Sequence, residues 1–395
     1  MHLEAGVKKD DDNKTLHRPQ GNALHSNYYE RWLKAIGFSL LAFWFVFVIV
    51  YWNISSDEPA SAGRADVALD IPSRTNAVAS GTFENAFPEE TNFMVIGDYG
   101  TGSEDQVRVA QTLKMFAAAM EPKPSFVLST GDQIYEHGIA SADDPMLKPR
   151  FEKMYEHPDL RVPWYITIGN HDCEGSIDAM LEYARQKDSL WYMPRRYYKI
   201  DRPVAPKTIL RMIVVDACDL VCGHEPRNVR CKDSMNKQSS EKTRVEQYQW
   251  IEEVLSAGMP AGIERMWTIV VGHWAVYSYA GNADTPELIR SLDPLLQKYK
   301  VHAYFNGHDH CMQHIKKVEN GWTRNYFVSG AGGYKVHDLK PHARANPDLV
   351  HAAMVHGFMT VRMTKDLFRV QLVDKMGDIL YAADVDYEAP WDKTQ

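Results

Sequence analysis

The sequence has little of several features that mark specialised classes of protein. Only 5 cysteines occur in 395 residues, which excludes a disulfide-dense scaffold. Basic residues do not predominate, because 44 Lys and Arg stand against 52 Asp and Glu. This acidic balance argues against a general nucleic-acid binder, which needs a basic surface. The chain has no internal repeat and only one long apolar run, so a collagen and a polytopic membrane protein are excluded as well.

The long apolar run lies near the N-terminus. Residues 35–52 read AIGFSLLAFWFVFVIVYW, and no charged residue occurs between Lys34 and Asp57. About 20 apolar residues span a bilayer, so we predict a transmembrane signal-anchor over residues 35–56. Two alternatives stay open. One is a buried helix, which seldom contains so long a charge-free run. The other is a signal peptide cleaved at the small-x-small triplet that begins at Ala60.

The charges on the two sides of this run predict its orientation. Arg18 and Arg31 precede it, whereas acidic residues predominate after it. By the positive-inside rule, residues 1–34 form a cytosolic tail and the C-terminal part lies in an endomembrane lumen or outside the cell. Residues 57–90 are rich in Ser, Ala and Pro and are expected to form a stalk. The predicted organisation is a type II single-pass protein with one large domain over residues 91–395.

From residue 91 onward, short apolar runs alternate with helical patterns. The runs typical of buried strands cover residues 93–96, 126–129, 164–168, 209–216, 267–271 and 303–305. Apolar stripes with helical spacing occur over residues 109–120 and 248–255. Residues 357–374 are typical of a strand hairpin that turns at Lys365. This alternation predicts an α/β fold.

Side chains of the kinds that bind metals follow five of these strands. The segments are GDYG, GDQIY, GNHD, VVGH and GHDH, and their candidate ligands are Asp98, Asp132, Tyr135, Asn170, His273, His308 and His310. Ligands of open α/β sheets bind beyond the carboxyl ends of strands. We therefore expect all five segments to meet at one edge of the sheet. One such segment alone is more often an ordinary turn, but the ordered set of five is specific.

The ligand types indicate the chemistry. Oxygen and imidazole ligands without cysteine suit a hard metal or zinc. Seven candidates are too many for one ion, and with Asp132 shared they divide into two sites of four. Two metals about 3.5–4 Å apart hold the attacking and leaving oxygens of an in-line displacement, as in phosphate ester hydrolysis. Tyr135 favours Fe(III), because a phenol with a pKa of about 10 ionises near neutral pH only beside a strongly charged ion.

The five segments together resemble the purple acid phosphatases of the calcineurin-like metallophosphoesterases, especially the small tartrate-resistant type. The resemblance covers roughly residues 91–385 and includes VPWYITIGNHD, VVGHWAVYS and SGAGG. Most other metallophosphoesterases carry a histidine two positions after the first aspartate. Here that position is Gly100, and Tyr135 is present instead, as in the purple type. The resemblance implies a metallophosphoesterase four-layer α-β-β-α sandwich, preceded here by the N-terminal transmembrane helix.

The resemblance also implies roles for individual residues. Fe(III) would be held by Asp98, Asp132, Tyr135 and His310, and a divalent ion, Fe(II), Zn(II) or Mn(II), by Asp132, Asn170, His273 and His308. His171 matches a substrate-side histidine that bonds the phosphate and protonates the leaving oxygen, and Asp172 is a candidate to orient it. The implied activity is that of an acid phosphatase, in which a metal-bound hydroxide attacks a phosphate monoester in line.

The sequence departs from the tartrate-resistant pattern beside the active site. Such proteins usually carry a second substrate-side histidine after the VVGH strand, and Asn282 lies about where it would be. An amide hydrogen-bonds phosphate but supplies no proton. We therefore list Asn282 with His171 as a catalytic candidate and expect a weaker or shifted acid limb of the pH profile.

The cysteines depart from the pattern as well. Cys222 matches a family cysteine whose usual partner is absent, and Cys218 or Cys231 would have to replace that partner. An oxidising lumen makes such a bridge plausible. Cys173 and Cys311 each follow a metal-site segment and are expected to be small buried filler.

Two other functions fit the same residues. A phosphodiesterase or nucleotide hydrolase of the same superfamily would use the same metal site, so only substrates separate it from a monoesterase. A catalytically silent scaffold would keep the fold without turnover, and the complete set of seven ligands argues against it.

Overall fold

The computed structural model describes residues 87–224, 226, 228–387 and 389, which all belong to one unit, Ala77–Gln395. The predicted tail, signal-anchor and nearly all of the stalk lie outside these residues. Among the residues that are described, no helix is both long and apolar enough to cross a membrane.

The first seven-stranded sheet has the strand order β14-β13-β12-β1-β2-β3-β4. Its strands are β1 (Thr91–Ile96), β2 (Pro124–Ser129), β3 (Trp164–Ile166), β4 (Trp191–Tyr192), β12 (Gly357–Met363), β13 (Phe368–Asp374) and β14 (Ile379–Asp384). Strands β1 to β4 run parallel, and β12 pairs antiparallel with β1. Strands β12 and β13 form the predicted hairpin. Every residue of β1 is buried, as expected for a central strand covered on both faces.

The second seven-stranded sheet has the order β11-β9-β10-β8-β7-β6-β5. Its strands are β5 (Tyr198–Ala205), β6 (Thr208–Val214), β7 (Arg265–Val271), β8 (Ala303–Asn306), β9 (Met312–Glu319), β10 (Trp322–Ser329) and β11 (Leu349–Ala353). Strands β6, β7 and β8 are parallel and carry the last three predicted strand runs. The β9–β10 hairpin is an addition to the predicted strands.

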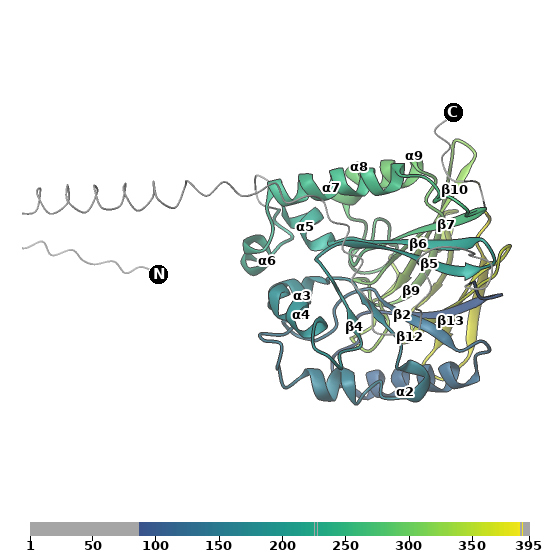
Figure 1. Cartoon of the computed structure of the whole chain (residues 1–395). Coiled ribbons are helices and arrows are strands. Elements are labelled where there is room, and N and C mark those ends of the chain that lie inside the picture. Colours follow the sequence, from purple (N-terminus) through teal and green to yellow (C-terminus); the bar gives the residue numbers. More distant parts are fainter. Residues whose placement is uncertain (1–86, 225, 227, 388, 390–395) are drawn as a thin grey trace, which may run out of the picture. The chain divides into compact units, whose positions relative to one another are not determined.

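Helices cover the outer faces of the two sheets. They are α2 (Glu104–Ala119), α3 (Asn170–Glu174), α4 (Ile177–Ala184), α5 (Ala217–Cys222), α6 (Asp233–Lys237), α7 (Glu241–Ser256), α8 (Pro286–Ser291) and α9 (Asp293–Lys298), with short turns at Lys148–Glu152, Pro158–Leu160 and Ala343–Ala345. Figure 1 shows α2 along one outer face and α7, α8 and α9 along the opposite one, with both sheets between them. The predicted α/β architecture is confirmed, with two mixed sheets.

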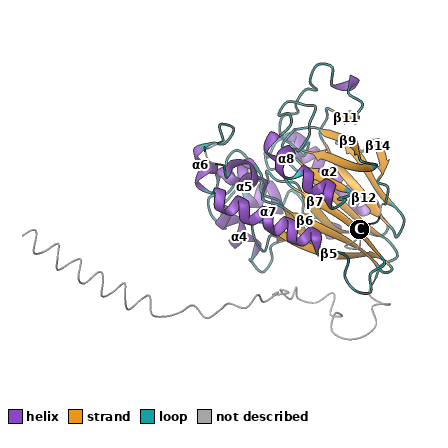
Figure 2. Cartoon of the chain, turned by 90° about the horizontal axis from the view of Figure 1, so that it is seen from above, coloured by secondary structure: helices purple, strands orange, loops and turns teal. Residues whose placement is uncertain are grey.

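The two long helices follow the predicted apolar stripes. Ser103 caps α2 by accepting a hydrogen bond from the Gln106 N–H, and the helix buries Val109 and Leu113. Helix α7 buries Ile251 and Leu255. In both views α4, α5 and α6 lie beyond one end of the sheets (Figures 1 and 2). This is the end where strands β3 and β6 finish, because α3 and α5 follow those strands within four residues.

Candidate metal centre

The predicted ligands come from loops at the carboxyl ends of five strands. Strands β1, β2 and β3 belong to the first sheet, whereas β7 and β8 belong to the second. The expectation of one sheet edge is therefore wrong, because the carboxyl ends of two sheets contribute. Hydrophobic periodicity identifies strands but carries no information about which strands pair. The sequence alone therefore does not assign the strands to two separate sheets.

The loops hold three predicted ligands in the left-handed backbone region. The φ angles are 57° at Asp98, 54° at Asp132 and 65° at His308. Such conformations cost about 1–3 kcal/mol each outside glycine and gather at functional sites. Hydrogen bonds between the loops hold them in place: the Asp98 N–H donates to the Gly131 carbonyl at 3.0 Å, and the His308 N–H donates to the Asp98 carboxylate at 3.1 Å.

Glycines let these loops approach one another closely. A Cβ atom on Gly169 would lie 2.1 Å from Oδ1 of Asp132. A Cβ atom on Gly100 would lie 1.7 Å from the Gln133 carbonyl oxygen. The position at which most other metallophosphoesterases carry a histidine therefore cannot hold a side chain in this backbone.

Asp98, Asp132, Tyr135 and His310 form one buried cluster. The Tyr135 hydroxyl lies 3.0 Å from Oδ2 of Asp132 and 3.2 Å from Oδ1 of Asp98. Nε2 of His310 lies 3.4 Å from Oδ1 of Asp98. Nδ1 of His310 is 2.9 Å from the Lys335 carbonyl, which only accepts hydrogen bonds. Nδ1 therefore carries the proton, and Nε2 turns its lone pair toward the carboxylates.

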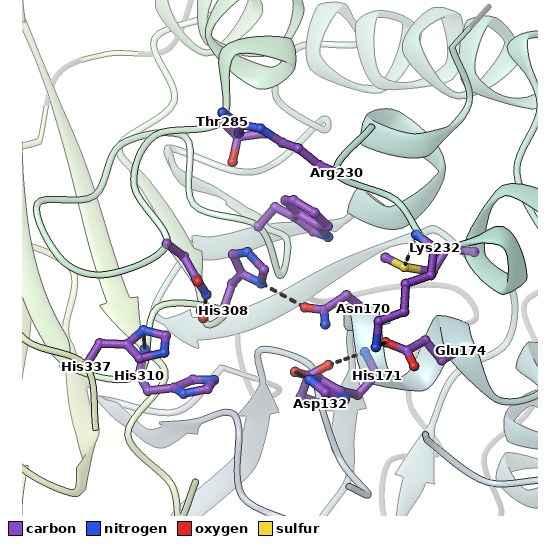
Figure 3. Close-up of a pocket in the computed structure, with 13 residues that line it drawn as sticks. Asp132, Asn170, His171, Glu174, Arg230, Lys232, Thr285, His308, His310 and His337 are labelled. Atoms are coloured by element: carbon purple, nitrogen blue, oxygen red, sulfur yellow. Dashed lines mark hydrogen bonds and ion pairs between the residues drawn. The ribbon is translucent and has the colours of Figure 1, made fainter. Parts of the chain in front are cut away.

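Asn170, His273 and His308 form a second group beside Asp132. Oδ1 of Asn170 lies 3.0 Å from Nε2 of His273 and 2.8 Å from Nδ1 of His308, and Figure 3 shows the latter contact. Nε2 of His273 lies 3.5 Å from Oδ2 of Asp132. Nδ1 of His273 donates to the Thr130 carbonyl at 2.8 Å, so Nε2 again presents a lone pair.

The Nε2 lone pairs of His310 and His273 thus face oxygen acceptors, and only a cation or a proton relieves such an arrangement. Neighbouring ligands of an ion bound at 2.0–2.2 Å lie about 3.0–3.5 Å apart, which is the spacing of the atoms here. Atoms of Asp98, Asp132 and His273 lie within 4.8 Å of one another. The donor set thus fits two metal ions that share Asp132.

Burial sets the protonation of these groups. It raises the pKa of the Asp98 carboxyl well above its usual value, and although His273 opposes this, the Asp132 carboxylate adds to it. Burial also raises the pKa of the Tyr135 phenol, with Asp132 and Asp98 acting in the same direction. The pKa of His308 is lowered by burial and by the neighbouring imidazoles. Without added positive charge, the site therefore disfavours its own anionic forms.

His171 and Asn282, the two predicted catalytic candidates, both line the cavity beside these groups, and Figure 3 shows His171 there. The His171 N–H donates to Oδ1 of Asp132 at 2.9 Å, and Nδ1 contacts the Glu136 carbonyl. Burial alone would lower the pKa of His171, but the Asp132 carboxylate and the Glu136 carbonyl hold it above the usual value. The Asn282 side-chain amide donates to the His308 carbonyl.

Asp172 has a different role from the one expected. Its carboxylate accepts the backbone N–H groups of Asp132 at 2.8 Å, Gln133 at 3.1 Å and Gly169 at 2.8 Å. It therefore fixes the loops after β2 and β3, and the structure gives no bond from Asp172 to the His171 ring among the described residues.

The cavity measures about 530 Å³ and includes side chains that the sequence interpretation missed. They are Glu174, Arg230, Lys232, Met235, Trp274, Thr285 and His337. Lys232 and His137 contact the Glu174 carboxylate at 2.6 and 2.8 Å. Trp274 directly follows His273 in the VVGHWAVYS segment. The others lie outside the strand-end motifs, so only their position in the folded chain reveals them.

The disulfides correct the interpretation of the cysteines. Cys222 pairs with Cys231, one of the two predicted alternatives. The expectation that Cys173 is filler is wrong, because it pairs with Cys218 and links α3 to α5. These helices follow strands of different sheets, so their proximity depends on the stacking of the sheets. Cys311 is free and buried, as expected.

Comparison with known proteins gives consistent results. A family model for calcineurin-like phosphoesterases matches residues 83–312. Purple acid phosphatase 4 of Arabidopsis thaliana is 33% identical over 295 residues, which cover 74% of this chain and 83% of that protein. Tartrate-resistant acid phosphatase type 5 of Sus scrofa is 29% identical over 311 residues, which cover 73% and 85%.

Solved structures share the fold. GAP50, described as the anchor in the inner membrane complex of Plasmodium, aligns with a TM-score of 0.64 at 20% identity and covers 76% of this chain and 90% of that one. The purple acid phosphatase PPD1 of yellow lupin aligns with a TM-score of 0.52 at 15% identity and covers 75% and 53%. At these identities the likeness concerns the fold alone.

Proposed function

Because the chain belongs to the calcineurin-like phosphoesterase family, as a hydrolase homologous to the purple acid phosphatases, we propose that it hydrolyses phosphate monoesters at a centre of Fe(III) and a divalent metal. One observation carries this proposal. Oxygen and nitrogen ligand atoms from seven residues converge in two adjoining groups, and one of them is a buried phenol. A phenolate ligand favours Fe(III) at that position.

The roles follow from the two groups. Asp98, Tyr135 and His310 would hold Fe(III), and Asn170, His273 and His308 would hold Fe(II), Zn(II) or Mn(II), with Asp132 shared between them. When bound, the two cations activate water and neutralise the charge that develops on the phosphate.

His171 and Asn282 line the same cavity. His171 would bond the phosphate and give a proton to the leaving oxygen, which suits a ring whose pKa is held above its usual value. Asn282 would only orient the phosphate, because an amide transfers no proton.

The visible spectrum of the oxidised, metal-replete protein tests the metal assignment. We expect a phenolate-to-Fe(III) charge-transfer band that disappears in Tyr135→Phe. Tyr334→Phe is the matched control, because the Tyr334 ring stacks on Tyr135 at 4.2 Å while its hydroxyl bonds Glu136 instead. Absence of the band from the wild-type protein would instead indicate a plain zinc or manganese phosphoesterase.

A substrate panel tests the reaction. We expect an aryl phosphate monoester to be hydrolysed with a higher kcat/KM than the corresponding diester. The reverse preference would identify the phosphodiesterase or nucleotide hydrolase alternative. No turnover of either ester by metal-replete protein would favour a silent scaffold.

We also propose that the catalytic domain lies in an endomembrane lumen or outside the cell, held by a signal-anchor over residues 35–56. The charge-free run of the sequence and the two disulfides support this location, because disulfides persist in oxidising compartments.

A further inference from the structure

Asn282 stands about where a second substrate-side histidine is expected, but another histidine lines this cavity. His337 lines the same cavity as Asn282 and His171. It lies in the loop between β10 and the turn at Ala343–Ala345, far from any of the metal-type segments in the sequence. Figure 3 shows it beside His310, at the edge of the ligand groups.

A buried carboxylate holds the His337 ring. Nδ1 of His337 lies 2.7 Å from Oδ1 of Asp309, whose side chain is fully buried. The His310 backbone N–H also lies 3.2 Å from this Nδ1. Nδ1 is therefore engaged by two partners, and Nε2 is the nitrogen left for another partner. The His337 ring also stacks on His310 with centroids 4.1 Å apart. These contacts fix the orientation of the His337 ring.

The same carboxylate connects His337 to the predicted position of the second histidine. The Asn282 N–H donates to Oδ1 of Asp309 at 3.2 Å. A β-bridge between Ala280 and Leu339 joins the two loops, and a Cβ atom on Gly281 would lie 3.0 Å from the His337 ring. The loop that carries Asn282 and the loop that carries His337 therefore form one wall of the cavity.

We propose that His337 is a substrate-binding residue whose Nε2 contacts the phosphate group, and that it supplies the imidazole that Asn282 does not. This inference rests on the proposed phosphatase function. The contact needs no single protonation state: a neutral ring accepts from the hydroxyl of a singly protonated phosphate, and a charged ring donates to an unprotonated oxygen. Asp309 is a positioning residue in this arrangement, since it reaches the phosphate only through His337.

Binding of inorganic phosphate to the full-length, metal-replete protein tests the proposal, with calorimetry for the Kd and mass spectrometry for the metal content. His337→Phe keeps a ring over His310 but removes both nitrogens, whereas His337→Ala removes the ring as well. We expect both variants to retain metal and to bind phosphate about tenfold to hundredfold more weakly, the effect of losing one hydrogen bond to a charged group. His342→Asn, an exposed change in the same loop, should match the wild-type protein.

Other results would overturn the proposal. Wild-type phosphate affinity in His337→Phe would mean that the nitrogens are not used. Loss of metal from both variants would assign His337 to the support of His310 instead. Adding Asn282→His to His337→Phe should restore part of the affinity, and absence of rescue would contradict the equivalence of the two positions.

The same measurements keep the two proposals separate. A wild-type protein that binds phosphate but hydrolyses no ester would contradict the phosphatase function, while weaker binding by His337→Phe would still support His337. An active enzyme whose His337→Phe variant keeps its phosphate Kd would contradict only the role of His337.

Discussion

Individual buried side chains decide how the metal centre is supported. Asp172 accepts three backbone N–H groups from the loops after β2 and β3, so one carboxylate satisfies donors that would otherwise be orphaned. Asp309 does the same on the other side, where it bonds the Asn282 N–H and His337. Asp172 comes two residues after the predicted ligand Asn170, and Asp309 separates the predicted ligands His308 and His310. Adjacency to a motif therefore identifies supporting residues as well as ligands.

Another buried residue, His314, predicts a pH effect on stability. Its ring bonds the Tyr381 hydroxyl at 2.9 Å and Oδ1 of Asn325 at 3.1 Å. Burial lowers its pKa to about 4, although the Asn325 bond opposes this. The unfolded chain, with an ordinary histidine pKa of about 6.5, takes up the proton first as the pH falls. The stability from neutral His314 is thus complete above pH 6.5 and is lost toward pH 4.

The variant His314→Gln removes this titration. Between pH 7.5 and pH 5 we expect the stability difference between wild type and variant to shrink by about 2 kcal/mol, from 1.36 kcal/mol per pKa unit. Urea unfolding at the two pH values measures it, and effects of pH on metal binding are common to both proteins. His342→Asn, which is exposed, should show no such convergence. If the free energies of unfolding of His314→Gln and wild type differ by the same amount at both pH values, the lowered pKa of His314 is disproved.

At the scale of elements, two disulfides hold α3 and the segment around Arg230 beside the cavity. Cys173–Cys218 closes a separation of 45 residues and fixes α3, the helix that begins with Asn170 and His171. Cys222–Cys231 closes a separation of 9 residues and holds the segment that carries Arg230 and Lys232 into the cavity. Loop-closure entropy assigns about 4 kcal/mol to the first bond and about 2–3 kcal/mol to the second.

Paired alanine variants test this order. We expect Cys173→Ala with Cys218→Ala to lose more stability than Cys222→Ala with Cys231→Ala, and to lower kcat because α3 loosens. The second pair should mainly raise KM, through the displaced Arg230 and Lys232. Cys311→Ala leaves both bonds intact and serves as the control. Equal stability losses would contradict the loop-length argument.

Most of the helices and strands near the site could be predicted from the sequence. The six predicted strand runs all fall on observed strands, and the stripes over residues 109–120 and 248–255 fall on α2 and α7, because burial imposes local periodicity. The seven ligands follow strands, so they could be located before any pairing was known. What could not be predicted depends on long-range stacking: the division into two sheets, the Cys173–Cys218 bond, and the arrival of Lys232 and His337 at the cavity.

At the scale of the whole molecule, the charge of the cavity and the proposed compartment both agree with the proposed function. The formal charge is −8, yet the proposed metal ions and two cationic side chains would make the cavity positive. An anionic substrate is therefore favoured locally against the global sign. Disulfides persist in oxidising compartments, and this agrees with the proposed export of the domain behind a signal-anchor.

Extraction and protease protection test the proposed signal-anchor over residues 35–56. In microsomes from expressing cells, we expect the full-length chain to resist carbonate extraction and the catalytic domain to be protected from added protease. Phe45→Lys with Val48→Lys should abolish both properties, because each charge at the centre of a membrane helix costs about 2.5–3.5 kcal/mol on insertion. Thiol alkylation should then report four additional free cysteines, since the domain would remain in a reducing cytosol.

Ala62→Lys, in the predicted stalk, should behave as wild type. Protection from protease combined with release by carbonate would instead indicate a cleaved signal peptide, and a wild-type chain fully open to protease would refute export altogether.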